Sequence, residues 1–388
     1  MFTMAQMIPA PGAFIAGVVL FLTVVWEAFE AIILPRRVTR KFRVTRLFYR
    51  TTWRIWKLFA KFFSAKKRRE AWLGFYGPLS LLFLMGLWAV GLVLGFALMQ
   101  YGAGSAISLS GSQPGFWTDL YLSGTTFFTL GLGDVLPRSS LARVLVVVEG
   151  GFGFAFLAGL ISYLPVTYGS FSKREVTISL LDSRAGTPPT AGELLRRHSY
   201  DGGQESLRDL LKDWELWSAE LMESHLSYPV LAFFRSQHDN QSWIASLTAI
   251  LDACALLQVG IEGRCERQAN LTFAIARHAV ADLSQVFGTP PAPLPHERLR
   301  AEDLGRIRGT LAQHGLKLRD GAEADRKLTD FRKMYEPYVY SLANYLQLSL
   351  PPWIPEKKGK DNWQTTAWGE QSGFVDRQPA TAAVDDHH

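Results

Sequence analysis

Six consecutive residues have the types and spacing of a backbone that binds a dehydrated cation. They read Thr-Leu-Gly-Leu-Gly-Asp and run from Thr129 to Asp134. To strip a cation of its water, carbonyl oxygens must all point at one axis, which requires a backbone of alternating handedness. Gly131 and Gly133 can supply that alternation, because glycine reaches positive φ without a steric penalty. Carbonyl dipoles carry no net charge, so they bind a monovalent ion and still release it.

A Gly-x-Gly pair alone is a weak signal, which also suits a nucleotide-binding loop or a simple turn. The neighbouring residues in the sequence favour a cation-binding segment. Residues 115–128, just before it, are moderately apolar and too short to cross a bilayer, and Pro137 follows it before another apolar run. Non-helical backbone at membrane depth is tolerated only where it is buried in protein or lines water. The order therefore predicts a re-entrant loop, in which a short helix enters over 115–128 and the six residues climb back out.

Three stretches are long and apolar enough to cross a membrane. The chain has 388 residues, of which 48% are apolar, and the excess is concentrated in Pro11–Leu34, Phe75–Met99 and Leu141–Leu164. Each exceeds the roughly 20 residues that a helix needs to cross the hydrocarbon core. The first stretch has no basic start, since the earliest charge is Glu27, which favours a span over a cleaved signal peptide. We predict an all-α membrane protein with three transmembrane helices and a re-entrant pore loop.

In this setting the six residues resemble the filter of the pore-loop potassium channel superfamily, Thr-(Val/Ile/Leu)-Gly-(Tyr/Phe/Leu)-Gly-Asp. The resemblance covers residues 72–167 and holds at every filter position. It implies a prokaryotic ion channel with one pore loop per chain, so that a homotetramer closes one ring of carbonyls. It also implies potassium ions in the filter and no other cofactor. The implied ion-binding residues are Thr129, Leu130, Gly131, Leu132, Gly133 and Asp134, with filter support from Thr126 and Phe128.

Two residues depart from the usual pattern of that superfamily. Leu132 stands where most members have a tyrosine whose hydroxyl ties the filter to surrounding aromatics, and Phe128 stands where many have a second threonine. Leucine occurs at the first of these positions in some two-pore-domain potassium channels. The departures leave a weakly selective pore, or a filter that inactivates, as an alternative to strong potassium selectivity.

The third apolar stretch holds a carboxylate and a group of glycines, and each has two interpretations. Glu149 is costly near the middle of a membrane and must face protein or water or take up a proton. It either braces the pore helix from behind, or attracts cations and senses protons. Gly150, Gly151 and Gly153 lie where the resemblance implies a gating hinge, although small residues also promote close helix packing in membranes.

The connection between the first two spans is strongly basic. Residues 36–69 hold 14 Lys and Arg and no acidic residue, in a chain whose net charge is +6. Short basic connections stay in the cytoplasm, so we expect the N-terminus outside and everything after residue 167 inside. The resemblance to prokaryotic channels implies a multi-pass protein of the plasma (inner) membrane.

Within this connection, cations and aromatics recur at helical spacing on different faces. The pattern predicts an amphipathic helix in the headgroup region, with aromatics in the bilayer and cations toward anionic lipid. A solvated basic helix and a voltage sensor are the alternatives, the latter with few acidic partners on the spans. Glu27 and Glu30 are expected to pair with this segment, or to form a proton or ion relay. The cations are Arg43, Arg46, Arg50, Arg54, Lys57 and Lys61, and the aromatics are Phe42, Tyr49, Trp53, Trp56 and Phe63.

The second half of the chain predicts a helical cytoplasmic domain. Residues 169–190 form a charged linker with a short β-like run at 176–180, and apolar residues at helical spacing over 191–350 predict five to seven helices. The polar residues from 351 onward, broken by Pro and Gly, predict a disordered tail. Two cysteines in the whole chain indicate no disulfide framework.

No catalytic signature accompanies this domain, since the sequence has no Walker loop, Gly-x-Ser-x-Gly elbow or paired zinc cysteines. We expect neither an enzyme nor a nucleic-acid partner. An unidentified small-molecule or ion regulator stays open. Four residues would line a ligand or metal site, or else be helix caps and satisfied core histidines. They are Glu223, His225, His238 and Asp239.

The sequence therefore predicts a potassium-selective channel whose cytoplasmic domain assembles or gates the pore. One alternative is a weakly selective monovalent cation channel, and another is a membrane-anchored signalling or ligand-binding module with a non-conducting pore fold. The expected segments are an N-terminal transmembrane helix (1–35), a basic interfacial helix (36–70), a pore domain (71–168, last span 140–165), a linker (169–190), a helical domain (191–350) and a tail (351–388).

Overall fold

The computed structural model describes residues 10–32, 44–104, 107–109, 115–238, 240–261, 265–355 and 361–362. Its contacts divide the chain into two compact units. The membrane unit comprises residues 1–173 together with 223–235, and the helical unit comprises residues 174–222 and 236–388. The protein is an all-α membrane protein, as predicted, and each unit is described by itself below.

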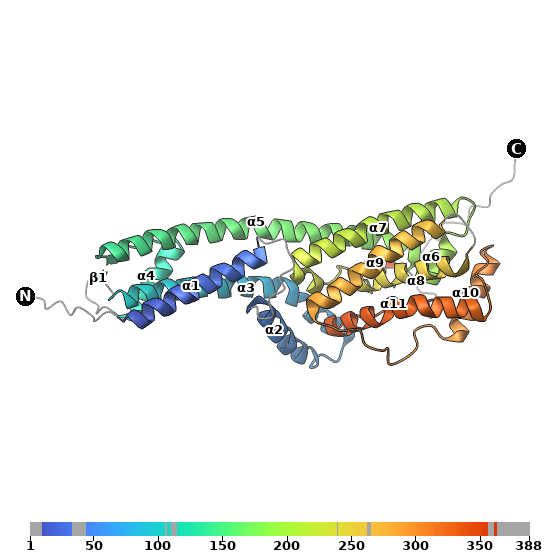
Figure 1. Ribbon diagram of the computed structural model, residues 1–388, viewed down its shortest axis with the longest axis horizontal. Coiled ribbons are helices and arrows are strands. Elements are labelled where there is room, and N and C mark those ends of the chain that lie inside the picture. The colour runs from blue at the N-terminus through green and yellow to red at the C-terminus, as the bar shows by residue number, and fades with distance from the viewer. Residues whose placement is uncertain are drawn as a thin grey trace, which may run out of the picture. The chain divides into compact units, whose positions relative to one another are not determined.

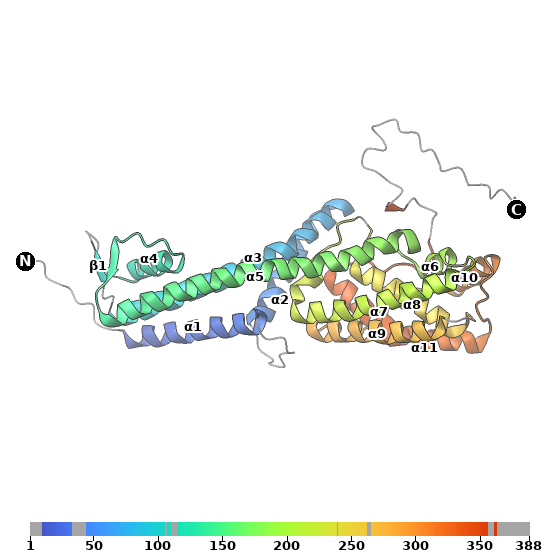
Figure 2. The same cartoon turned by 90° about the horizontal axis from the view of Figure 1, so that it is seen from above.

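Three long apolar helices make up most of the membrane unit: α1 (Pro11–Ile32), α3 (Lys66–Gly102) and the first part of α5 (Ser140–Ala185). α1 lies along α3 (Figures 1 and 2). The two backbones come close at small residues, since a Cβ on Gly17 would lie 2.6 Å from the Gly95 carbonyl oxygen. Such close approach favours helix packing in a bilayer, where no hydrophobic effect drives helices together. The most apolar part of α5 is only 11% buried in one chain, which leaves it free to meet lipid or neighbouring chains.

Between α3 and α5 lies the predicted short helix, α4 (Phe116–Phe127). It packs against α3 and is bracketed by two short antiparallel strands, β1 (Ile107–Leu109) and β2 (Val135–Pro137), which lie beside it in Figure 2. The strands bring the two ends of the loop together, because Leu109 pairs with Val135 and Ile107 with Pro137. The loop therefore starts and ends at the same edge of the unit.

The basic segment forms α2 (Val44–Ala60), and α3 then begins at Lys66. The prediction that its aromatics enter the bilayer is wrong for Trp53 and Trp56. Trp53 is 1% exposed and packs against Tyr76, and Trp56 stacks on Trp72 with ring centroids 4.4 Å apart. Aromatic side chains bury large apolar areas in protein cores, so packing against α3 decides the direction of these rings. Residues 33–43 lie outside the described part of the chain.

Both acidic residues of α1 are buried and hydrogen-bonded. Glu27 accepts hydrogen bonds from the backbone amide and the hydroxyl of Thr45, at 3.1 and 3.0 Å. Glu30 accepts one from the Trp26 indole at 2.8 Å. Thr45 lies in the first turn of α2, where backbone amides lack helical acceptors. Glu27 thus supplies a hydrogen-bond acceptor to a backbone amide in the first turn of the basic helix.

α5 continues without a break to Ala185, so the predicted linker at 169–190 and the β-like run at 176–180 are wrong. Ile178, Leu181 and Ala185 are buried at spacings of three and four residues, which is the period of one helix face. Burial of that face outweighs the strand propensity of the branched residues, because propensity is weaker than tertiary packing.

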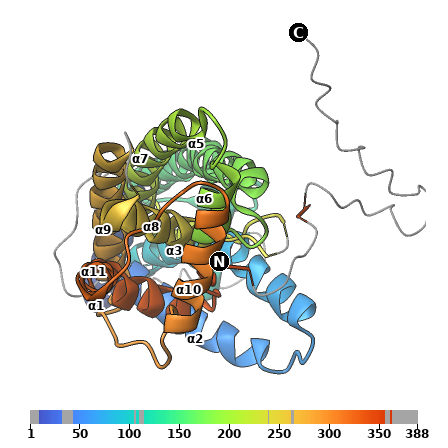
Figure 3. The same cartoon turned by 90° about the vertical axis from the view of Figure 1, so that its right-hand side faces the viewer.

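Within its described residues the helical unit holds the end of α5 from residue 174 and α6 to α11, except for the last turn of α7. Their bounds are α6 Ala191–Arg197, α7 Gly203–Ser227, α8 Trp243–Gly260, α9 Glu266–Phe287, α10 Ala301–Gln313 and α11 Ala322–Leu346. α8 contacts α6, α9 and α11 and lies among them in Figure 3. It is as long and apolar as a membrane span, but 94% of its most apolar window is buried. α8 is therefore the core helix of this bundle, and α1, α3 and α5 correspond to the three stretches that the sequence predicts to span the membrane.

A buried ionic cluster joins the helices of this bundle. Arg298 donates to Asp252 at 2.6 Å, to Glu336 at 2.9 Å and to the Pro351 carbonyl at 3.0 Å. The guanidinium also lies 5.7 Å from the ring centroid of Trp353, which is 1% exposed. The predicted disordered tail is thus wrong at its start, because Pro351 and Trp353 belong to the core.

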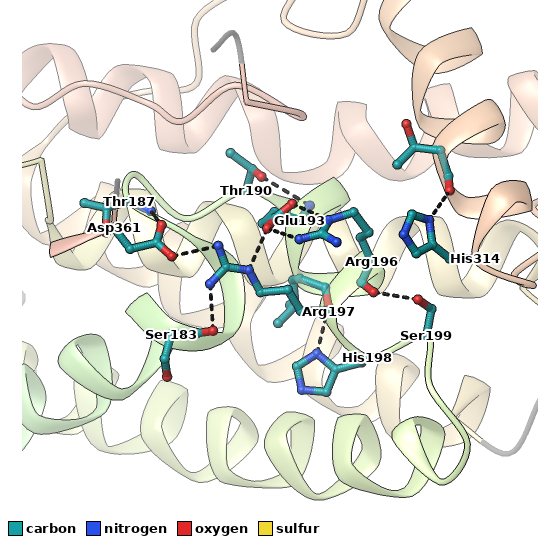
Figure 4. Close-up of polar contacts among 12 residues, drawn as sticks. Ser183, Thr187, Thr190, Glu193, Arg196, Arg197, His198, Ser199, His314 and Asp361 are labelled. Carbon is teal, nitrogen blue, oxygen red and sulfur yellow. Dashed lines mark hydrogen bonds and ion pairs between the residues drawn. The ribbon is translucent and has the colours of Figure 1, made fainter. Parts of the chain in front are cut away.

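A second ionic cluster lies at the start of α6 (Figure 4). Thr190 caps the helix by accepting a hydrogen bond from the Glu193 amide at 3.3 Å, as its capping-box spacing suggests. Glu193 accepts from Arg196 and from Arg197, each at 2.6 Å, and Arg197 also donates to Asp361 at 2.8 Å. The hydrogen bond from Arg196, joined by those from Arg197, outweighs burial and lowers the pKa of Glu193 from 4.5 to about 2.

This lowered pKa predicts a pH-dependent contribution to stability. Glu193→Gln should cost the helical unit about 1–3 kcal/mol at neutral pH, the usual range for charged hydrogen bonds. Because the folded pKa is the lower one, the contribution is complete above the unfolded value of 4.5 and is lost as pH falls toward 2. Unfolding midpoints of the full chain in detergent should therefore converge for wild type and variant in that window. Glu205→Gln, at a side chain 75% exposed, is the control, and a pH-independent difference would contradict the prediction.

Candidate functional site

The six residues after α4 form an exposed, non-helical segment with alternating backbone handedness. Thr129, Gly131 and Gly133 have φ values of 57°, 56° and 77°, and Leu130 and Leu132 between them do not have positive φ. The positive φ at the two glycines was expected. The value at Thr129 was not, because a β-branched residue adopts it only where its surroundings compel it. Alternation over five residues is the geometry that turns successive carbonyls toward one axis.

The end of α4 holds this segment in place through backbone hydrogen bonds. The Thr129 amide donates to the Thr126 carbonyl at 3.0 Å, and the Leu130 amide donates to the Thr125 carbonyl at 2.7 Å. Thr126 therefore supports the segment through its backbone. Phe128, by contrast, is 60% exposed, and its ring lies edge-to-face with that of Phe127, with centroids 5.3 Å apart.

A tyrosine that the sequence analysis missed ties the outer end of the segment to α4. The Tyr121 hydroxyl donates to the Asp134 carboxylate at 3.0 Å. Leu132 cannot make the bond of the usual tyrosine, but this hydrogen bond braces the loop one residue beyond Gly133. Its only sequence signal is a tyrosine in the middle of a short helix that precedes an aspartate.

Glu149 lies behind α4 and is fully buried, with 0% exposure. Its carboxyl is hydrogen-bonded with the Ser123 hydroxyl, and that hydroxyl also donates to the Val93 carbonyl at 2.8 Å. The arrangement links α3, α4 and α5, which is the bracing interpretation of Glu149.

The glycines of α5 differ sharply in their surroundings. A Cβ on Gly153 would lie 2.0 Å from the Phe127 carbonyl oxygen, and one on Gly150 would lie 3.9 Å from the Thr126 side chain. A Cβ on Gly151 would meet nothing within 4 Å. Gly153 thus lets α5 approach the last turn of α4, which agrees with the packing interpretation. Close packing accounts for a glycine at this position without a gating hinge.

Three of the four candidate ligand or metal residues lie in the part of the chain that the structure describes. In the membrane unit Glu223 is exposed, while His225 is 1% exposed and hydrogen-bonded to Ser224 at 3.2 Å. In the helical unit His238 is exposed, and Asp239 lies outside the described residues. Across the part of the chain that the structure describes, no group of three His, Cys, Asp or Glu side chains could hold a metal ion.

Comparison with known proteins agrees with this geometry. Residues 83–167, which contain α4, the six residues and the first part of α5, match the family described as "Ion channel". The chain carries a pore-loop ion channel domain. It is also similar to the "Uncharacterized membrane protein YdjJ" of Bacillus subtilis (strain 168), with 25% identity over 198 residues. That match covers 49% of this chain and 55% of the relative, about half the length of each. No solved structure shows a significant match.

The contrast between Gly151 and Gly153 gives a direct test of packing against bending. Gly153→Ala should destabilise the protein by about 1–3 kcal/mol, because the methyl group collides with backbone that cannot move away. Gly151→Ala, in the same helix, should be neutral or stabilise it by about 1 kcal/mol through helix propensity. Thermal unfolding of the full chain in detergent measures both. Equal effects of the two substitutions would contradict the packing role.

Proposed function

We propose that this protein conducts potassium ions passively across the membrane, through a pore lined by Thr129, Leu130, Gly131, Leu132, Gly133 and Asp134. The observation that carries the proposal is the alternation of positive φ at Thr129, Gly131 and Gly133. It favours a file of carbonyl oxygens, which replace the hydration shell of a monovalent cation. The match to ion channels over 83–167 supports a pore at this place in the chain.

The proposed assembly is a homotetramer, because one chain supplies one loop and a closed ring of carbonyls requires four. Exposed apolar side chains near the segment favour contacts with neighbouring chains. Leu130 and Leu132 are 62% and 63% exposed in one chain, and Trp117 on α4 is 78% exposed. In the proposed topology the N-terminus is outside and the helical unit is cytoplasmic, where it assembles or gates the pore and receives any small-molecule or ion regulator.

Flux of potassium into liposomes that contain the purified full chain tests this function. Wild type should show barium-sensitive flux. Gly131→Ala should abolish it without preventing assembly, because alanine at a φ of 56° is strained by about 1–2 kcal/mol. Gly169→Ala is the control, since a Cβ there meets nothing within 4 Å and α5 is helical at that point. Absence of barium-sensitive flux from wild type under every condition would instead favour a membrane-anchored module without conduction.

A weakly selective cation channel is the second candidate, and Leu132 and Phe128 are the residues that favour it. The Tyr121–Asp134 hydrogen bond favours potassium selectivity instead, since it holds the outer end of the segment. The bi-ionic reversal potential between potassium and sodium separates the two. A value near zero would identify the weakly selective pore, while a value near the potassium limit would identify the selective one.

We also propose that α2 contacts anionic lipid headgroups, on a face other than the one first predicted. Its exposed apolar stripe includes Leu47, Ile55 and Leu58, which are 52%, 49% and 58% exposed. Arg46 and Arg50 are exposed on an adjacent face. Apolar side chains enter the acyl boundary while neighbouring cations meet phosphate, so this face of α2 suits a helix in the interface.

Replacing Arg46, Arg50 and Arg54 by Gln should therefore reduce the anionic lipid that the protein retains. Each cation near an anionic surface contributes about 1 kcal/mol, so the triple variant should lose most of its preference for phosphatidylglycerol over phosphatidylcholine. Native mass spectrometry of the full chain counts the bound lipids. Replacing Arg306, an exposed arginine of the helical unit, is the control, and equal retention by all three proteins would contradict the proposal.

A further inference from the structure

A short piece of chain between α7 and α8 belongs to the membrane unit, although most of both helices belongs to the helical unit. We call residues 223–235 the docking segment. It contains the last turn of α7 and a short 3-10 helix, η1 (Pro229–Phe233), which contacts α3. Four consecutive residues of η1, Val230 to Phe233, are between 1% and 3% exposed. Such burial is unusual for a connection between helices, which normally runs over the surface.

The docking segment packs against both α3 and α5. Val230, Leu231 and Phe234 form one buried cluster with Leu81 and Met85 of α3 and Phe171 of α5. The rings of Phe234 and Phe171 lie 5.4 Å apart between centroids, and those of Tyr228 and Tyr163 also lie 5.4 Å apart. Aromatic pairs at this distance stabilise beyond the area they bury. The segment therefore connects the two helices that flank α4 in the sequence.

Phe233 adds a third helix to this arrangement. Its ring lies 5.0 Å from that of Trp53 on α2 and 5.0 Å from that of Tyr76 on α3. At the end of the segment, Arg235 pairs with Glu70 at 3.6 Å. The docking segment thus holds α2, α3 and α5 at one place, and both of its ends continue covalently into helices of the helical unit.

We propose that the docking segment is a regulatory latch of the pore. Packed in place, it restrains α3 and α5 from separating, and it releases them when a conformational change in the helical unit draws α7 and α8 away. This inference rests on the proposed conduction of potassium. A packed cluster of this kind has discrete packed and unpacked states, so it can switch an equilibrium between closed and open pores. Loosening the latch should therefore increase conduction.

Gly77 offers a way to loosen the latch from the opposite side. A Cβ at this position of α3 would lie 2.7 Å from the Phe234 ring, so Gly77→Ala should displace that ring. Gly86→Ala is the matched control, because it lies on the same helix and a Cβ there meets nothing within 4 Å. Phe234→Ala removes the ring itself and keeps the test decisive if Gly77→Ala fails to fold.

Hydrogen exchange in the full chain tests docking without reference to conduction. The amides of Val230 to Phe234 should exchange slowly in wild type and in Gly86→Ala. They should exchange about tenfold faster or more in Gly77→Ala and Phe234→Ala, because displacement or loss of a large core side chain favours local opening. Equally slow exchange in Phe234→Ala would overturn the docking role.

Potassium flux in liposomes then tests regulation. Gly77→Ala and Phe234→Ala should raise basal flux on the order of tenfold, within the usual range of coupling between sites. The potassium–sodium reversal potential should stay at the wild-type value, because the latch does not touch residues 129–134. Faster exchange with unchanged or lower flux would overturn the latch. Absence of flux from wild type, with slow exchange, would overturn conduction and with it the regulatory role, while docking would stand.

Discussion

The membrane unit depends on one constraint, which is that non-helical backbone cannot be left unsatisfied at membrane depth. Residues 129–134 leave the helical path just after α4, and their exposed amides and carbonyls must meet protein, water or ions. The first three amides bond to carbonyls in the last turn of α4. Residues 129–134 are exposed in one chain, which is consistent with a pore surrounded by further copies.

The contacts around the segment hold α4 in place against α3 and α5. Ser123 and Glu149 connect α4 to α3 and α5 through buried hydrogen bonds. Gly153 allows α5 to touch the end of α4, and the pairing of β1 with β2 closes the loop. These contacts come from both flanking helices, so the position of the segment depends on how α3 and α5 are packed. This dependence explains why a latch that acts on α3 and α5 would control conduction.

The helical unit shows how burial, and not composition, separates a core helix from a membrane span. α8 has the length and hydropathy of a span, yet α6, α9 and α11 cover it. The buried cluster of Arg298, Asp252 and Glu336 fixes α11 against α8, because each charge would be costly without its partners. Burial raises the pKa of the Cys254 thiol, also on α8, which makes it an inert core residue instead of a reactive one.

The sequence by itself determined the local features. Span length, the limits of α4 and the positive φ of Gly131 and Gly133 follow from hydropathy and backbone sterics, which depend on neighbours along the chain. The tertiary structure decided what each side chain meets. It decided that Tyr121 pairs with Asp134 and Ser123 with Glu149, and that Trp53 points inward. It also decided the full length of α5 and the docking of residues 223–235. They depend on packing between segments far apart in sequence, and local propensity is too weak to fix such partners.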